Sequence, residues 1–197
     1  MMNKNPRESY RKNFSIERVL HNSPTLVREI SLLEEKCLPF QMCHANNQTY
    51  FSSVLNNPEN INLILKYKDR LVGFLLAKKY SCAYRELINH DPDLKSQKEN
   101  CYFVETIQIH PQFRKKGGFG FLVGKLLATV KKEKIKDFCL YARRKNSFSN
   151  FVQKRFTGQK IRTVENWLGF GEAFDYLEIS ISKQLLSKLD KHFQKVK

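Results

Sequence analysis

The chain has 197 residues and a formal net charge of +16, because 35 Lys and Arg outnumber 19 Asp and Glu. This length suits one domain, and a hydrophobic content of 41% with 15 Phe and 8 Tyr is enough for one sizeable core. We therefore predict a single domain over 1–197, with a loosely ordered basic lead-in at 1–15. The positive charge favours polyanions such as nucleic acid, acidic lipid or a polyphosphate cofactor, without choosing among them.

The sequence contains no apolar run near the roughly 20 residues that cross a bilayer, and its first residues lack the apolar stretch of a signal peptide. Its five cysteines are scattered, odd in number and without a Cys-x-x-Cys pair, which argues against a disulfide framework and a zinc site. We therefore expect a cytoplasmic protein without a bound metal.

Turn residues and hydrophobic periodicity predict the elements of the first half. Ser23-Pro24 offers an N-cap followed by proline in the first helical position, and apolar residues recur at helical spacing until Pro39 ends the helix. Next come a short helix at 48–55, a hairpin of strands at 61–67 and 71–78, and a mostly polar insertion at 80–100 that is helical around 82–88. An insertion of this kind is either a binding segment or a tolerated surface loop.

The second half begins with a strand, a helix and a strand at 102–110, 121–134 and 138–142. Such a βαβ crossover makes its two strands parallel. The pattern then predicts a helix at 146–156, strands at 162–165 and 174–182, and an amphipathic helix at 183–197 that we expect to pack on its own domain. The predicted fold class is α/β (α+β): a mixed, mostly antiparallel central sheet with one parallel pair, flanked by helices.

The most informative stretch runs from Arg114 to Gly120, between the strand at 102–110 and the helix that follows. A strand that delivers glycines to the first turn of a helix exposes N–H groups at the positive end of the helix dipole, which suits phosphate oxygens. Arg114, Lys115 and Lys116 add positive charge there. The spacings of a P-loop and of a dinucleotide-binding turn are both absent. An ordinary strand-to-helix connection is the alternative.

This stretch resembles the signature of the GNAT superfamily of acetyl-CoA-dependent N-acyltransferases. In that signature, Pro-x-x-Arg precedes Arg/Gln-x-x-Gly-x-Gly/Ala at a helix start, and Pro111-Gln112-Phe113-Arg114 and Gly118-Phe119-Gly120 fit it. Counted from Arg114 the glycines come one residue late, so the motif is filled either by Gly117 and Phe119 or by Gly118 and Gly120. We favour Gly118 and Gly120, with Lys115 in the leading basic position. The order of elements agrees over the whole chain.

The resemblance implies that acetyl-CoA binds with its pyrophosphate at the turn from Arg114 to Gly120 and its pantetheine along the backbone of the strand at 102–110. It also implies that Asn146 contacts the cofactor arm. The cofactor residues that it implies are Ile107, Gln108, Ile109, Arg114, Lys115, Lys116, Gly117, Gly118, Phe119, Gly120 and Asn146.

The same resemblance implies a general base, and a departure from it leads us to a second catalytic candidate. Glu105 lies where several family members place a general base, and strand alternation puts it on one face with Ile107 and Ile109, where a carboxylate is partly desolvated. An ordinary polar strand residue is the alternative. Gln153 stands where many relatives carry a tyrosine acid, so Tyr141 is our substitute for protonating the thiolate, and water is another.

The sequence thus predicts an N-acetyltransferase that moves an acetyl or related acyl group from acetyl-CoA to a primary amine. The alternative is a catalytically weak scaffold whose basic surface holds nucleic acid or an acidic partner, which we do not favour. A small amine, an amino acid derivative and a protein N-terminus all fit as acceptor. The acidic cluster in the insertion, the candidate substrate loop, comprises Glu86, Asp91 and Asp93.

Overall fold

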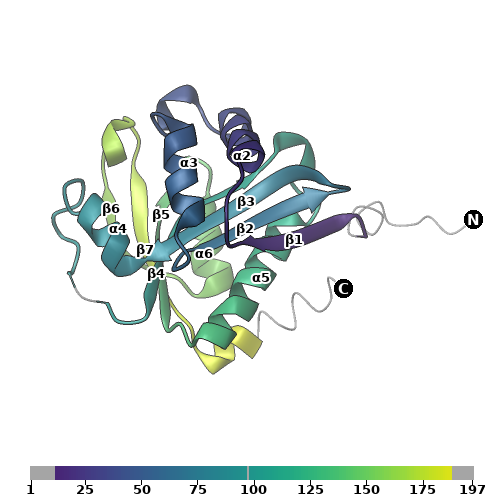
Figure 1. The fold of residues 1–197 in the computed structure, drawn as a ribbon. Helices are drawn as coiled ribbons and strands as arrows, with labels where there is room; N and C mark the ends of the chain where they lie inside the picture. The colour runs from purple at the N-terminus through teal and green to yellow at the C-terminus, as the bar shows by residue number, and fades with distance from the viewer. Residues whose placement is uncertain (1–11, 97, 188–197) are drawn as a thin grey trace, which may run out of the picture. The chain divides into compact units, whose positions relative to one another are not determined.

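The computed structural model of the protein describes residues 12–96 and 98–187 (Figure 1). Its strands are β1 (Phe14–Val19), β2 (Ile61–Tyr67), β3 (Arg70–Lys79), β4 (Cys101–Ile109), β5 (Asp137–Arg143), β6 (Gln159–Val164) and β7 (Phe174–Ser180). Its α-helices are α2 (Pro24–Cys37), α3 (Asn47–Asn56), α4 (Tyr80–Leu87), α5 (Gly118–Glu133) and α6 (Phe148–Phe156). Short 3-10 turns lie at Phe40–Met42, Pro111–Phe113 and Trp167–Gly169.

The described strands form one sheet in the order β1-β2-β3-β4-β5-β7-β6. Neighbouring strands β1 and β2, β5 and β7, and β6 and β7 run antiparallel, whereas β4 and β5 run parallel. The parallel pairing places Cys101 opposite Asp137 and Phe103 opposite Cys139, at the beginning of both strands. The predicted fold class and the predicted βαβ crossover through α5 are therefore confirmed.

The chain divides into two compact units. Among the described residues, the first unit comprises the chain up to Leu76 together with Thr106–Ala128, and the second comprises Ala77–Glu105 and the chain from Thr129 onward. Strands β3 and β4 and helix α5 pass from one unit to the other. The single domain over 1–197 stays a prediction.

The core of the first unit lies between helices α2 and α3 and strands β1 to β3 (Figure 1). Helix α2 begins as predicted, because the Ser23 side chain accepts a hydrogen bond from the Leu26 N–H (3.2 Å) and Pro24 needs no N–H partner in the first turn. Its apolar face buries Ile30 and Leu33 against Phe51 of α3 and Phe74 of β3.

The core of the second unit is aromatic. The ring of Tyr141 stacks on Trp167 with 3.6 Å between their centroids, and Tyr176 lies 5.0 Å from the same tyrosine ring. The insertion at 80–100 belongs to this core, because α4 buries Tyr80 there and the Tyr80 hydroxyl donates to the carbonyl of Lys95 (2.7 Å). The described part of the insertion is thus a folded segment.

Two predictions near the termini need correction or remain open. Phe14 and Ser15 belong to strand β1 rather than to a loose lead-in, because they pair with Tyr67 and Lys66 of β2. Residues 1–11 of the predicted lead-in and residues 188–197 of the predicted C-terminal helix lie outside the described residues.

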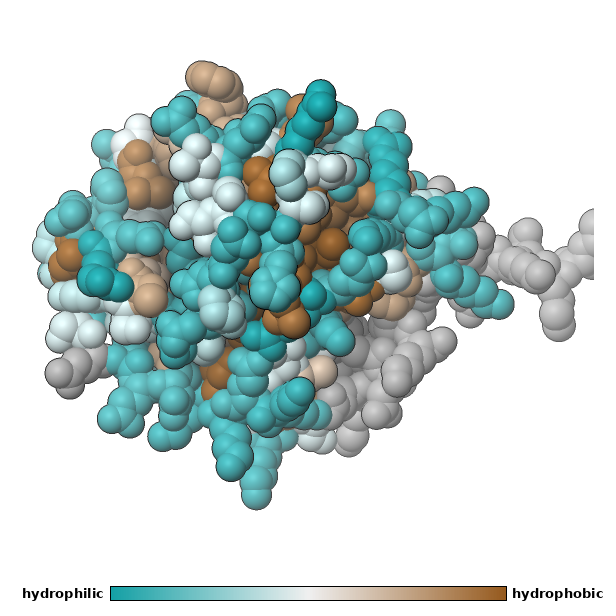
Figure 2. Space-filling model, viewed as in Figure 1, coloured by the Kyte–Doolittle hydropathy of each residue, from teal (hydrophilic) through white to brown (hydrophobic). Residues whose placement is uncertain are grey.

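The face of the protein in Figure 2 is mostly hydrophilic, with small hydrophobic patches, as a net charge of +16 leads us to expect. Within residues 12–96 and 98–187, every helix is too short or too polar to span a membrane.

Candidate functional site

The predicted anion site is a tight turn in the first unit. Its chain leaves β4 through His110, whose N–H donates to the Val72 carbonyl (2.8 Å), and reaches α5 with Lys115 and Gly117 in the left-handed region at φ values of 62° and 96°. Glycine adopts this region without strain. Because the Phe121 N–H donates to the Gly117 carbonyl (3.3 Å), the N–H groups of the first turn lie at the open end of the helix.

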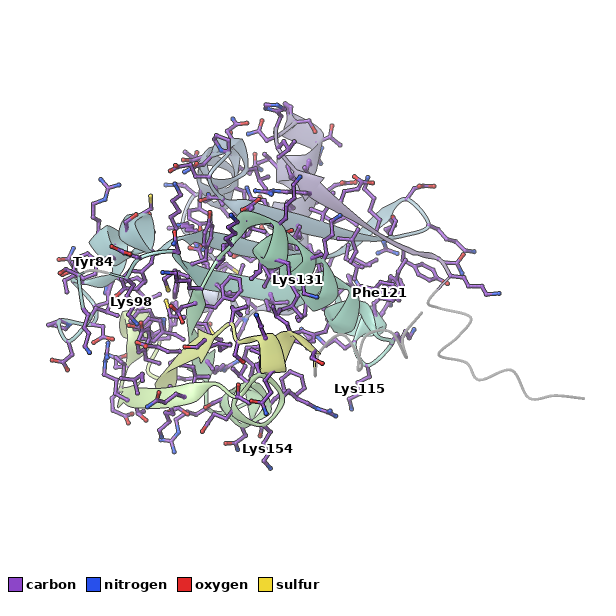
Figure 3. The ribbon with its side chains drawn as sticks, turned by 90° about the horizontal axis from the view of Figure 1, so that it is seen from below. Tyr84, Lys98, Lys115, Phe121, Lys131 and Lys154 are labelled. Carbon is purple, nitrogen blue, oxygen red and sulfur yellow. The ribbon has the colours of Figure 1, made fainter. Side chains whose placement is uncertain are left out.

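Aromatic side chains hold this turn against the strands. Phe113 lies 5.1 Å from the ring of Tyr67 and 6.4 Å from that of Phe14, and Phe121 lies 5.6 Å from Phe14. Figure 3 shows Lys115 at the turn before α5, directed outward. The turn is thus packed against the strands, and both Arg114 and Lys115 are exposed to solvent.

The basic residues of the turn differ in their partners. Arg114 donates from Nε to the Ile109 carbonyl (3.1 Å) and from Nη2 to the Cys37 carbonyl (3.3 Å), so it ties the turn to β4 and to the end of α2. Lys116 places its Nζ 5.4 Å from the ring centroid of Phe113. Arg114 therefore has a bracing role that the sequence did not reveal.

Gly118 is a glycine for a packing reason. A Cβ atom at this position would lie 2.7 Å from Cδ2 of Leu65, a fully buried side chain of β2. The missing side chain thus points toward the sheet and lets the helix approach it. Gly73 on β3 leaves space for the neighbouring strand β4 instead, because its Cβ would lie 2.7 Å from Cδ1 of Ile109 and 2.9 Å from the Gln108 carbonyl.

The second half of β4 is more accessible than its first half. Residues Cys101–Val104 are buried, whereas residues from Glu105 to Ile109 are only partly buried, although β4 is the middle strand of the described sheet. The Gln108 amide donates to the Thr106 hydroxyl (2.8 Å). Interior strands are normally covered on both faces in such folds, so the half that contains Ile107–Ile109 is unusually accessible for an interior strand.

Glu105 lies beside a buried cation of the second unit. Its Oε1 is 3.2 Å from Nζ of Lys78 on β3, and the two side chains are 14% and 7% exposed. The same Nζ lies 2.9 Å from Oε2 of Glu86 on α4. The sequence predicted apolar neighbours for Glu105 but not this ammonium group.

Tyr141 is bound within the second unit. Its hydroxyl donates to the carboxylate of Asp91, which also binds the guanidinium of Arg162. Burial and the Asp91 carboxylate raise the pKa of Tyr141 well above its usual value. These contacts make Tyr141 a poor proton donor, and they place Asp91 in the core rather than in an acidic substrate loop. Its role as general acid stays a prediction, which these contacts weaken.

The residues predicted after β5 have local partners. The Asn146 side chain accepts from the Phe148 N–H (3.0 Å) at the start of α6. On that helix, the Gln153 amide donates to the Ser149 hydroxyl (3.1 Å), which in turn donates to Asp175 (2.6 Å). Asn146 is exposed and binds the backbone just before α6, where Ser147 is the N-cap, while Gln153 belongs to a buried polar network.

In the described part of the chain, no three His, Cys, Asp or Glu side chains come together as a metal site would require. The predicted absence of a metal stays a prediction.

The fold is shared with solved acetyltransferases. The ribosomal-protein-S18-alanine N-acetyltransferase from Escherichia coli superposes with a TM-score of 0.65 at 13% identity, over 86% of this chain and 94% of that one. The Arabidopsis thaliana NAA60, solved with acetyl-CoA, gives 0.60 at 15% identity, over 87% and 99%. The PaiA N-acetyltransferase from Thermoplasma acidophilum, solved with coenzyme A, gives 0.59 at 15% identity, over 85% and 99%.

No family model and no curated protein sequence matches the chain. The likeness therefore rests on structure at low sequence identity, and it agrees with the resemblance carried by the turn and the order of elements. The chain has the GNAT acetyltransferase fold.

Proposed function

We propose that the protein is an N-acetyltransferase that binds acetyl-CoA at the turn before α5 and transfers its acetyl group to a primary amine. The observation that carries this proposal is the turn itself. A left-handed Gly117, the N-terminus of a 16-residue helix and an exposed Lys115 follow one another there, and this combination fits a pyrophosphate. The fold supports the proposal, because solved proteins of this fold carry coenzyme A or acetyl-CoA.

We assign the cofactor contacts on the same basis. The first turn of α5 with Gly117 and Gly120 would receive the pyrophosphate, and Lys115 and Lys116 would add charge. The partly buried backbone of Ile107–Ile109 would lie along the pantetheine. Gly118 and Arg114 would shape this binding site rather than contact the cofactor: Gly118 lets α5 approach β2, and Arg114 braces the turn. Asn146 stays a proposed contact of the cofactor arm.

Glu105 is the proposed general base. In the transfer, a C–N bond forms to the acceptor nitrogen and the C–S bond of the thioester breaks. The proton of the amine passes to Glu105, directly or through a water molecule, and the departing thiolate takes a proton from water. Water is the preferred donor because Tyr141 is engaged by Asp91.

The first test is mass spectrometry of ligands that copurify with the protein, where a bound acyl-CoA would also identify the acyl group. The second is release of free CoA thiol with a panel of amines, peptide N-termini included. Glu105→Gln should keep its affinity for acetyl-CoA while its turnover falls about 100-fold or more at neutral pH. The loss should shrink as pH rises, since more acceptor amine is then neutral. Normal turnover by this variant would contradict the base assignment.

A further inference from the structure

A buried ammonium group joins two carboxylates in the second unit. Lys78 stands near the end of β3 with its side chain 7% exposed, 3.2 Å from Oε1 of Glu105 and 2.9 Å from Oε2 of Glu86. Burial of an unpaired ammonium is costly, so these carboxylates account for its place in the fold. Three elements meet at this group: β3, α4 and β4.

The charge of Lys78 is permanent at physiological pH. Burial alone lowers the pKa of Lys78, but the neighbouring Glu105 and Glu86 carboxylates raise it above its ordinary value. These two glutamates are also the charged groups that bear on it from β4 and α4. Glu105 therefore has a positive charge 3.2 Å from its Oε1, and in general an opposite charge at such a distance favours the ionised form of a carboxyl group, which is the form that accepts a proton.

We propose that Lys78 is a positioning residue for Glu105, and that Glu86 sets how strongly the Lys78 ammonium acts on it. This inference rests on the proposed role of Glu105 as general base. Contact with Oε1 fixes the orientation of the Glu105 carboxyl group and keeps it ionised. Glu86, with a side chain 60% exposed, draws part of the ammonium's hydrogen bonding away, so Glu105 remains basic enough to take a proton.

The ionisation of Glu105 can be followed without any acceptor. We would titrate its carboxyl carbon by NMR, assigned by its loss in Glu105→Gln. In Lys78→Met the midpoint should rise by about one pH unit or more, since an opposite charge in contact shifts a carboxylate by about that much. In Glu86→Gln it should fall. The matched control is Lys66→Met, which removes an ammonium paired with Glu17 on another strand pair (2.8 Å) and should leave the midpoint unchanged.

Kinetics then test positioning. With acetyl-CoA and the best amine of the panel, Lys78→Met should lower kcat about 10-fold or more with little change in KM for acetyl-CoA. The acidic limb of the pH profile of kcat should also move to higher pH in this variant. Lys78→Arg should retain most of the rate. In a Glu105→Gln background, Lys78→Met should cause no further loss, because its effect passes through the carboxylate.

The outcomes distinguish the positioning role of Lys78 from the general-base role of Glu105. An unmoved NMR midpoint in Lys78→Met, or an equal loss of rate in both backgrounds, would overturn the positioning role while leaving the base assignment intact. Normal turnover by Glu105→Gln would overturn the base assignment and the positioning role together. If Lys78→Met does not fold, Glu86→Gln alone decides, since a midpoint that fails to fall contradicts the sharing of the ammonium.

Discussion

Two glycines of the same helix should respond in opposite ways to an added methyl group. At Gly118 the new Cβ would lie 2.7 Å from Leu65 Cδ2, whereas ordinary carbon contacts lie at about 3.5–4.0 Å. The neighbour must therefore move by roughly 1 Å, and Leu65 is fully buried. Overpacking of this kind costs about 1–3 kcal/mol. At Gly124 no atom lies within 4 Å, so alanine gains helix propensity of about 1 kcal/mol.

We therefore expect Gly118→Ala to be less stable than Gly124→Ala by about 2–4 kcal/mol, measured by urea unfolding of both variants under identical conditions. Leu65→Val removes the clashing Cδ2 atom. It should therefore cost less stability when it is combined with Gly118→Ala than when it is made in the parent protein. The folded Gly118→Ala variant should also keep its calorimetric affinity for acetyl-CoA, since the methyl group points toward the sheet. Equal stabilities of the two alanine variants would refute the packing argument.

Further expectations concern the turn and the buried carboxylates. Gly120→Asp, which adds bulk and negative charge, should weaken acetyl-CoA binding at least tenfold, or about 1.4 kcal/mol, whereas Gly124→Asp serves as the calorimetric control. Lys115→Ala should weaken binding more at low salt than at high salt, because its exposed charge is screened. Asp91→Ala should cost about 3 kcal/mol of folding stability, since it removes the carboxylate that binds Arg162 and Tyr141, while exposed Asp93→Ala should cost little; a small loss at Asp91 in urea unfolding would contradict this. Burial raises the pKa of Asp175, but hydrogen bonds from Ser149 and Thr163 and the charge of Lys160 lower it below its ordinary value of 3.8, so its contribution to stability is present above that pH and lost as pH falls below it. Asp175→Asn should accordingly flatten the acid-side decline of the urea midpoint.

Local sequence signals were sufficient to predict helix α2 and the turn before α5. Ser23-Pro24 fixes a helix start by short-range hydrogen bonding, and the order of strand, glycines and amphipathic helix predicts a βαβ crossover. Strand β1 could not be predicted in this way. Its apolar residues Phe14 and Ile16 lie on one side and Val19 on the other, so the alternation is broken, and β1 forms because β2 offers an edge to pair with.

The surroundings of the candidate catalytic residues depend on tertiary contacts. Nothing in the sequence near Glu105 indicates that Lys78 will meet it, because that meeting requires β3 and β4 to bring the two residues together while α4 turns Glu86 back toward them. The same holds for Tyr141, whose contact with Asp91 depends on how the insertion packs. A motif thus locates the proposed cofactor turn, but not the ion pairs around the proposed base Glu105.

The division of the chain into two units has a consequence for any fragment of this protein. Because β3, β4 and α5 each begin in one unit and end in the other, neither unit is a continuous piece of sequence. A single cut in the insertion near residue 97 gives one fragment that lacks Thr106–Ala128 of the first unit and another that lacks Tyr80 and the rest of α4 from the second. We expect neither fragment to fold alone, and the two to fold only when they are mixed.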